Sequence, residues 1–554
     1  MSISYLDTLP VELVHRIFDN LDTKTIVLSI RYVCKKFYLI CSSYNRYRLN
    51  LKSISKSNFL FICQLIPFEN IISLTLSNED KTRGQIQLFI SLFNIEQFTR
   101  LQSLTLIQID DLHLNVFLNY IIKSSLKSLS ISIQPLQVKT NDVSSGLLSS
   151  TIAHSTLRNL YLNISCNEIQ WPNYCTLRYL RLFNRITLKY LCIILTHSPC
   201  LETLVLKEIT TDDYNPNVSS TSFKQLTSLT FEDGRIEIPK LDQCFTFTPS
   251  LIHLKLIGTE TFFTSSFDGY QWEKILQSKL RSLKTFEFFF SILTYSNYRS
   301  HNTENLINSY RTTFWLDKIQ CFINCDYIPN SRKIMLYTLP VCHTHFVYHI
   351  DSKKISLSNF DRKINSTDMN NVRNLDFNIT KDVKNISLSD NVVFRNVVYL
   401  KLGSGGEWPR HSLQYLSNII DLSRIIKLSL SVNFIPEHML NTVFNLNLLF
   451  NQAINLRSLF LYDYWTPENY MQRMQIICSI ISPNIKYLQI RVKDLNDIKY
   501  ILERLEYLTS VTFEYSQMLN IDRQEFKQAL QYLNRYTSMW DSQYALHVWF
   551  GNRK

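Results

Sequence analysis

The chain has 554 residues, of which 45% are hydrophobic and 19% are charged, and it contains only 9 glycines and 14 prolines. This composition is typical of a folded protein and excludes a chain made largely of flexible linkers. The first residues lack the basic start and apolar run of a secretory signal, and no stretch approaches the ~20 apolar residues of a membrane span. We therefore expect a protein of the cytoplasm, the nucleus or both, with no membrane partner.

The formal net charge is +12, which can indicate a surface that binds nucleic acid. However, lysines and arginines are spread along the chain without a run of five or more. We interpret them as a solvated surface and do not expect a nucleic-acid partner, although a basic chain can also favour acidic protein partners. The 12 cysteines are scattered and many lie on apolar faces, so most are expected to be buried free thiols.

The first 47 residues predict short helices with more apolar surface than they can bury among themselves. A helix is expected to begin at Pro10, because proline suits a first helical turn, with Asp7 or Thr8 as its cap. Two adjacent apolar stripes follow this helix, one formed by Val14, Phe18 and Leu21 and the other by Leu9, Leu13 and Ile17. A unit this small rarely builds a self-sufficient core, so we expect a partner to cover one stripe.

The order Leu-Pro-x-Glu-Leu (9–13), Ile-Phe (17–18), Leu-Asp (21–22) and Val-Cys-Lys-x-Phe (33–37) resembles the F-box. The F-box is the adaptor-binding module of SCF-type cullin-RING ubiquitin ligases, and the resemblance implies such a domain over residues 1–47. It also implies a set of residues that contact the adaptor or brace the helices that do: Leu9, Pro10, Glu12, Leu13, Ile17, Leu21, Leu28, Val33, Cys34 and Phe37. Many F-boxes carry a tryptophan shortly after the third helix, where this chain has Tyr44 and Tyr47. The alternative is an ordinary helical cap on a larger domain.

Beyond residue 50, a short motif of the form apolar-x-x-apolar-x-apolar recurs every few tens of residues. Its copies begin at Leu101, Leu126, Leu157, Leu177, Leu201, Leu226, Leu251 and Leu283, and then at Val397, Ile425, Leu456, Ile485 and Leu508. The last two apolar positions of each copy are two residues apart, which predicts a strand with one buried face. Between copies the apolar spacing is helical, as in 188–195, 439–444 and 495–505.

Units of strand, turn and helix must stack to bury both faces, which gives parallel strands on one side and helices on the other. The pattern resembles leucine-rich repeats, and the leaders Ser198-Pro199, Thr248-Pro249 and Ser482-Pro483 resemble those of the longer repeats in F-box receptors. The resemblance implies an α/β fold, with a leucine-rich-repeat-like solenoid over 48–554 whose strands line a concave face and whose helices line a convex face. The Asn or Cys expected after each strand is mostly missing, so the solenoid could be irregular. An ordinary α/β protein with leucine-rich strands is the alternative.

Two regions depart from the repeat pattern. The motif fades over about 289–371, where 314–325 and 335–340 predict longer aromatic strands that belong to divergent repeats or to an insertion. At the C-terminus, about 521–554, Phe526, Leu530 and Leu533 predict a helix, and 544–550 predicts a final strand. This segment could cap the last edge of the solenoid.

The sequence contains little that suggests chemistry. Cys321, Cys325, Cys342 and His345 have the residue types of a Cys₃His zinc site. However, Cys321, Ile323 and Cys325 alternate along a predicted strand, which favours thiols that face a core. No catalytic signature stands out, so we expect no enzyme, no catalytic residues, no metal and no cofactor.

The residues between and after the buried strand positions should share the concave face. This row of expected substrate-binding residues comprises Tyr161, Arg181, Phe183, Lys207, Lys255, Phe460, Tyr462 and Arg491. Aromatic and arginine side chains are common at binding hot spots. The resemblance therefore implies the substrate receptor of an SCF-type ligase, which binds an adaptor, through it a cullin, and an unknown protein substrate. The alternatives are an interaction scaffold that assembles no ligase and a repeat protein that binds RNA.

Overall fold

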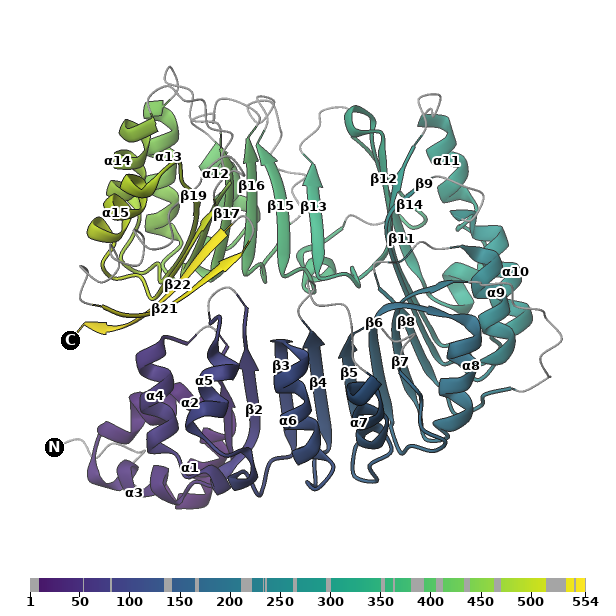
Figure 1. Ribbon diagram of the computed structural model, residues 1–554. Coiled ribbons are helices and arrows are strands. Elements are labelled where there is room, and N and C mark those ends of the chain that lie inside the picture. The colour runs from purple at the N-terminus through teal and green to yellow at the C-terminus, as the bar shows by residue number, and fades with distance from the viewer. Residues whose placement is uncertain are drawn as a thin grey trace. The chain divides into compact units, whose positions relative to one another are not determined.

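The structure is a computed structural model, and the chain divides into two compact units that are described separately (Figure 1). Unit 1 comprises Met1–Glu202, Asn534–Ser542 and His547–Lys554, and unit 2 comprises Thr203–Leu533 and Gln543–Leu546. The residues that the structure describes are 9–52, 54–79, 82–133, 142–164, 169–210, 222–232, 234, 237–262, 267–294, 300–349, 354–361, 364–379, 393–404, 412–432, 439–462, 470–514, 535–542 and 545–553.

Unit 1 begins with short helices and continues with alternating strands and helices. Its helices are α1 (Val11–Phe18), α2 (Thr23–Leu28), α3 (Lys35–Ser43), α4 (Lys56–Leu65), α5 (Gln85–Leu92), α6 (Asp111–Ile121), α7 (Asp142–Ile152) and α8 (Leu188–His197). Its main strands are β1 (Tyr47–Asn50), β2 (Ile71–Ser77), β3 (Ser103–Ile109), β4 (Ser128–Ile133), β5 (Asn159–Asn163) and β6 (Tyr179–Thr187). These six strands are neighbours in sequence order, and the pairs from β1 to β6 are parallel.

Unit 2 contains two groups of parallel strands and a short antiparallel part. The first parallel group is β7 (Thr203–Thr210), β8 (Ser228–Phe231), β9 (His253–Phe262) and β10 (Thr285–Leu293). The antiparallel part adds β12 (Lys333–Leu339), β11 (Phe322–Ile328) and β14 (Ile355–Ser358) to β10. The second parallel group is β13 (His345–His349), β15 (Asn374–Ile379), β16 (Tyr399–Ser404), β17 (Lys427–Val432), β18 (Ser458–Tyr462), β19 (Tyr487–Arg491) and β20 (Ser510–Glu514).

The helices of unit 2 come between these strands in the chain. They are α9 (Ile238–Phe247), α10 (Gly269–Lys279), α11 (Ser300–Asn308), α12 (Ser412–Ile419), α13 (Met439–Gln452), α14 (Tyr470–Ile480) and α15 (Leu495–Arg504). Figure 1 shows α13, α14 and α15 along one face of the second parallel group, and α6 and α7 along one face of β3–β5.

The core of each unit lies between the strands and these helices. In unit 1, Leu104 pairs in register with Leu74 and Leu129, and all three side chains are fully buried. In unit 2, Leu428 pairs with Leu400 and Leu459 in the same way. Because side chains alternate along a strand, the residues between these leucines lie on the opposite face, away from the helices. The repeated leucines thus define one buried face in each group of parallel strands.

The sequence motif identifies strands well. Every copy of the motif ends in a strand, and the expected helices within 188–195, 439–444 and 495–505 correspond to α8, α13 and α15. One further copy, in which Ile71, Leu74 and Leu76 carry the pattern, was missed and forms β2. The final strand also forms, as β22 (Ala545–Arg553), next to β21 (Arg535–Ser542). The helix expected from Phe526 to Leu533 lies outside the described residues.

The middle region differs from expectation at one point. A strand was predicted over 314–325, but Phe314–Lys318 forms a π-helical turn, and only Phe322–Ile328 is a strand. The turn places the indole of Trp315 in the core, where its ring centroid lies 5.0 Å from that of Tyr310 and 5.8 Å from that of Phe286. Burial of this large side chain accounts for the helical turn where aromatic composition alone suggested a strand.

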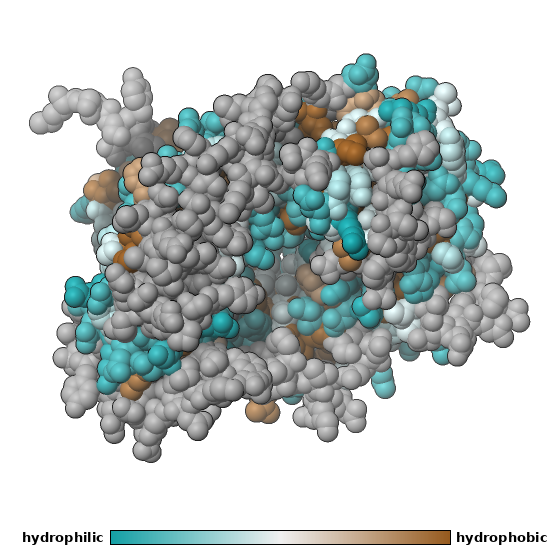
Figure 2. Space-filling model, turned by 90° about the horizontal axis from the view of Figure 1, so that it is seen from above, coloured by the Kyte–Doolittle hydropathy of each residue, from teal (hydrophilic) through white to brown (hydrophobic). Residues whose placement is uncertain are grey.

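Figure 2 shows the hydropathy of the described residues on one face of the molecule. There, the hydrophobic residues of the described part lie in several small groups among hydrophilic ones. Among the residues that the structure describes, no helix is long and apolar enough to span a bilayer.

Candidate functional site

Helices α1–α3 pack around one aromatic cluster. Val14 and Phe18 of α1 are buried, and the ring of Phe18 meets that of Tyr44 edge-on, with centroids 5.5 Å apart. The ring of Tyr47 meets Tyr44 in turn at 4.9 Å. The Tyr44 hydroxyl donates to Asp19 Oδ1 at 2.8 Å, and the Tyr47 hydroxyl donates to the carbonyl of Cys41 at 2.6 Å. These two tyrosines close the core of the three helices.

Several other apolar side chains of the same helical segment are exposed to solvent. Leu13 is 43% exposed and Ile17 is 41% exposed on α1, while Val33, just before α3, is 68% exposed. We call this surface the apolar face; its large hydrophobic members are Val11, Leu13, Ile17, Leu21, Tyr32, Val33, Tyr38 and Leu39. So many exposed apolar side chains on three short helices are typical of a protein-binding site.

The apolar face is fixed to the strands that follow it. The Thr23 hydroxyl donates to the backbone carbonyl of Arg48 in β1 at 2.7 Å, and Arg31 donates to the carbonyl of Leu65 in α4 at 3.2 Å. The carboxylate of Asp22 caps α2 by accepting from the backbone N–H of Thr25 at 2.8 Å. These contacts connect the helices to β1 and α4 through structured residues.

The ten residues predicted to contact an adaptor, or to brace the helices that do, occupy both kinds of position. Those on the exposed side are Pro10, Glu12, Leu13, Ile17, Leu21, Val33 and Cys34. Leu9 and Leu28 are half-buried, and Phe37 is buried. The exposed residues are accessible to solvent, and Phe37 packs inside the helices; their contact with an adaptor stays a prediction. The sequence analysis missed Tyr32, Tyr38 and Leu39, although their spacing beside Val33 and Phe37 is a helical signal.

The predicted substrate row is divided between the two units. In unit 1, Tyr161 pairs in register with Arg181, and the Arg181 guanidinium lies 4.5 Å from the ring centroid of Phe183. In unit 2, Lys207 is exposed on β7, while Lys255 of β9 donates to the carbonyl of Cys342 at 2.6 Å. The Lys255 ammonium group therefore already has a hydrogen-bond acceptor within the protein.

The remaining members of the row, Phe460, Tyr462 and Arg491, lie on β18 and β19. Phe460 is joined by two aromatic residues that the sequence analysis missed: its ring centroid is 6.2 Å from that of Tyr399 and 5.3 Å from that of Tyr487. Register places Tyr399 and Tyr487 on the same strand face as Phe460. Phe460 was selected because alternate residues of a strand share one face. The same rule identifies Tyr399 and Tyr487 when the first residue of each strand is included.

Polar side chains surround these rings. The Tyr487 hydroxyl donates to Gln489 Oε1 at 3.0 Å and lies 3.0 Å from Thr512 Oγ1, and Gln489 also bonds to Glu514. Burial raises the pKa of Asp376, on the same strand face, but hydrogen bonding and charge from His345 and the charge of Lys401 outweigh it, so the net pKa is lowered. Because Tyr487 is buried, the part of this cluster that a protein segment can reach consists of the half-buried Tyr399 and Phe460 and the exposed Tyr462.

The four residues with the types of a Cys₃His zinc site, Cys321, Cys325, Cys342 and His345, do not form a metal-binding group in the structure. Cys321, Cys325 and Cys342 are buried, and burial raises the pKa of the Cys342 thiol to about 12. Among the described residues there is no group of three or more His, Cys, Asp or Glu side chains that could hold a metal. The described cysteines are free thiols, and most of them are buried.

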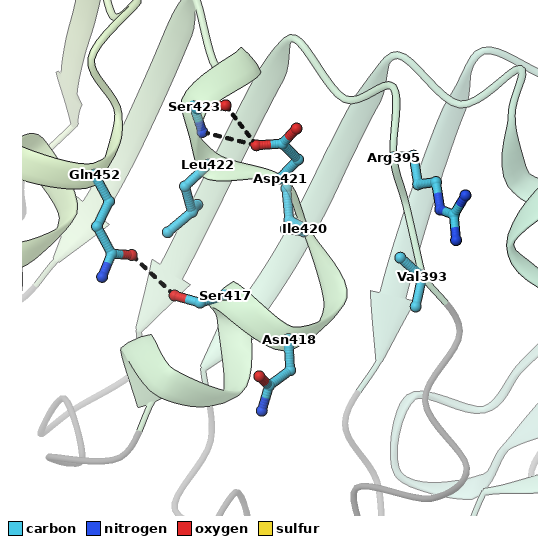
Figure 3. Close-up of a pocket in the computed structure, with 9 residues that line it drawn as sticks. All are labelled: Val393, Arg395, Ser417, Asn418, Ile420, Asp421, Leu422, Ser423 and Gln452. Carbon is cyan, nitrogen blue, oxygen red and sulfur yellow. Dashed lines mark hydrogen bonds between the residues drawn. The ribbon is translucent and has the colours of Figure 1, made fainter.

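A cavity of about 480 Å³ opens in unit 2 beside α12 (Figure 3). Val393 and Arg395 stand on one side of it, and Asp421 and Ser423 on the other, where Asp421 accepts hydrogen bonds from the backbone and hydroxyl of Ser423. Ser417 of α12 donates to Gln452 Oε1 at 2.9 Å along its wall. No residue of the predicted sites lines this cavity.

Comparison with known proteins identifies the N-terminal helices. Residues 6–49 match the F-box domain, and this range includes the apolar face and all but the last residue of β1. No curated protein matches the chain. The match supports an F-box protein and indicates, at the general level, a receptor that binds an SCF-type adaptor. The leucine-rich-repeat character of the later residues stays a prediction.

Proposed function

We propose that this protein is the substrate-recognition subunit of an SCF-type E3 ubiquitin ligase. The apolar face binds the adaptor, and through the adaptor a cullin, while the strand faces opposite the helices bind a target protein for ubiquitination. The chain itself contributes no catalytic group and no cofactor. Its contribution is proximity, because holding a target lysine near the charged ubiquitin carrier raises the effective concentration of the reactants.

The observation that carries this proposal is the apolar face within the F-box match. Leu13, Ile17 and Val33 are each more than 40% exposed, although Val14 and Phe18, on the same helix as Leu13 and Ile17, are almost fully buried. Burying a leucine or isoleucine side chain contributes about 1.5–3 kcal/mol. A partner that covers several of these side chains therefore has ample binding free energy.

The remainder of the chain supports a leucine-rich-repeat-like solenoid. Strands follow one another in sequence order within each parallel group, and helices cover one face. The antiparallel strands β11, β12 and β14 support a central insertion rather than a divergent repeat. In this proposal the substrate contacts the open strand faces, at Tyr161, Arg181 and Phe183 in unit 1 and around Phe460 in unit 2.

Co-purification with an SCF adaptor and cullin tests the proposal. The full chain should capture both proteins. A Leu13→Asp/Ile17→Asp variant should capture neither, because it places charge in the apolar face, and it should still fold, because both side chains are exposed. Leu92→Asp/Leu112→Asp is the matched control, since these leucines are 49% and 79% exposed outside the F-box match. Capture of the adaptor without the cullin would favour the interaction scaffold, and capture of neither by the folded wild-type chain would contradict the proposal and also leave the scaffold as the better explanation.

A further inference from the structure

A row of basic side chains lies at the N-terminal ends of the strands of the second parallel group in unit 2, and it shares no residue with either proposed binding surface. Arg373, Arg457 and Lys486 come directly before β15, β18 and β19. Arg395 and Arg424 lie in the loops that lead to β16 and β17. All five side chains are exposed. We call these five residues the basic edge.

Backbone hydrogen bonds place this row in strict order. The N–H of Val398 donates to the carbonyl of Arg373, Ile426 donates to Val398, Arg457 donates to Ile426, and Lys486 donates to Arg457, at 2.8–2.9 Å. Neighbouring strands are about 4.8 Å apart, so the edge from Arg373 to Lys486 spans about 19 Å. An extended segment of about six residues covers that length.

In the part of the chain that the structure describes, most of these cations donate hydrogen bonds to backbone carbonyls and pair with no carboxylate. Arg373 donates to the carbonyl of Asn396, Arg457 donates to the carbonyl of Leu456, and Lys486 donates to that of Pro483, at 3.0–3.3 Å. Arg424 is paired with Asp421 at 3.2 Å. Among the described residues, no hydrogen-bond or ion-pair partner of the Arg395 guanidinium is present.

Acidic residues are fewer than basic residues at this edge. In the segments that lead to β15–β20 (366–373, 393–398, 420–426, 453–457, 481–486 and 505–509), the exposed carboxylates are Asp421 and Glu506, whereas Asp368 is buried. Lys427 at the start of β17 adds a further exposed cation. The edge therefore carries an excess of positive charge that complements an acidic partner.

Apolar groups are interleaved with the charges. Ile426 is 44% exposed and Ile454 is 57% exposed, and both lie close in sequence to basic-edge residues. The cavity of about 480 Å³ is bordered by Arg395 and also has Val393, Ile420 and Leu422 in its wall (Figure 3). A nucleic-acid phosphate backbone offers charged and polar groups but no aliphatic side chains. An acidic peptide with apolar side chains would contact both the cations and the aliphatic groups.

We propose that the basic edge, with Ile426, Ile454 and the adjoining cavity, binds an extended acidic protein segment that carries one or two aliphatic side chains. The acidic groups pair with Arg395, Arg424 and Arg457, and an aliphatic side chain enters the cavity. This inference needs only the edge in unit 2 and is independent of ligase assembly.

Fluorescence anisotropy with the full chain tests this inference. The probe is a fluorescein-labelled 12-residue peptide with five glutamates and two leucines. We expect it to bind, and to bind at least tenfold more weakly to Arg395→Gln/Arg424→Gln/Arg457→Gln. Lys189→Gln/Lys274→Gln/Lys499→Gln is the matched control, because it removes the same charge from exposed positions on α8, α10 and α15 and should bind like the wild type.

Two further measurements separate the causes of a loss. Arg395→Gln alone should weaken binding several-fold, and an unchanged midpoint of thermal unfolding in this variant would show that the loss does not come from misfolding. Replacing the two leucines of the probe by serine should also weaken binding several-fold. Absence of peptide binding to the wild type, equal loss in the control variant, or tight binding of a 20-nucleotide single-stranded RNA with no preference for the leucine-containing peptide would each overturn the proposal.

Discussion

Single residues explain how three short helices keep a defined shape while presenting apolar groups to solvent. Asp22 shows this most simply, because its carboxylate accepts from both the N–H and the hydroxyl of Thr25 at the start of α2. Burial raises the pKa of Asp22, but the hydrogen bonds from Thr25 and the charge of Lys24 outweigh it, so the net pKa lies below 3.8. The ionised form is therefore the one that caps the helix.

Asp22→Ala should lower the free energy of unfolding of this region by about 1 kcal/mol at pH 7. A group whose pKa is depressed by folding stabilises the protein above its unfolded pKa and loses this effect as the pH falls through its folded pKa. Hydrogen exchange of α2 at pH 7 and pH 3 checks the prediction, and the difference between wild type and variant should shrink at pH 3. An equal difference at both pH values would contradict it.

Two glycines in helices should respond to alanine in opposite ways. A Cβ at Gly269 would lie 2.5 Å from the carbonyl oxygen of Ser309, so Gly269→Ala should destabilise the protein by about 2 kcal/mol through overpacking. A Cβ at Gly146, inside α7, would meet no atom within 4 Å, so Gly146→Ala should stabilise it by about 0.5–1 kcal/mol. Thermal unfolding of the two variants tests both signs, and a shift in the same direction would be inconsistent with these environments.

At the scale of elements, the sequence predicted the strands and helices whose apolar residues recur at a regular spacing. The leucine motif identified strands because its two-residue spacing needs one buried face, and the same parity placed Phe460 and Tyr462 correctly on β18. Strands were also predicted over 314–325 and 335–340, but their antiparallel pairing was not, because these strands are buried on both faces and lack an alternating pattern: Asn324 and Asp326 of β11 are 1% exposed, and Cys325 between them is fully buried. Burial of polar groups depends on partners that are distant in sequence.

Asp326 is the centre of that antiparallel part. Its carboxylate accepts from the hydroxyls of Tyr337 at 3.0 Å and Ser356 at 2.6 Å, and it pairs with Lys354 at 3.1 Å. Asp326→Ala removes a buried carboxylate that pairs with the half-buried Lys354 and leaves the hydroxyls of Tyr337 and Ser356 without their acceptor, which should cost about 3 kcal/mol. Native-state hydrogen exchange of β11 and β12 measures this loss. Asp361→Ala, which removes an exposed carboxylate, should change little, and equal effects of the two variants would contradict the role assigned to Asp326.

At the scale of the whole molecule, residues near the two ends of the chain contact each other within unit 1. The indole of Trp549 donates to the carbonyl of Ile54 at 3.0 Å, and its ring centroid lies 6.2 Å from that of Phe59 in α4. The sequence predicted a final strand here but could not identify its neighbour, because no local pattern records a contact between residues 495 positions apart. The exposed side of α1–α3 was predictable, since the resemblance and the excess of apolar residues both indicated it.

Trp549→Ala should destabilise unit 1 by about 3–5 kcal/mol, because it leaves a large cavity and frees the carbonyl of Ile54. The loss should appear as faster hydrogen exchange in α4, far from the substitution in sequence. Tyr174→Ala, at a side chain that is 57% exposed in the same unit, is the control and should leave α4 unchanged. Unchanged protection of α4 in Trp549→Ala would show that the ends do not stabilise each other.

The central claim is that the apolar face is where the adaptor binds. The most direct measurement is hydrogen–deuterium exchange of the full chain with and without the SCF adaptor. We predict added protection in α1 and over residues 30–39, which carry Leu13, Ile17 and Val33, and no change in α5 and α6, which expose Leu92 and Leu112 outside the F-box match. Protection confined to other segments, or none at a saturating adaptor concentration, would contradict the account.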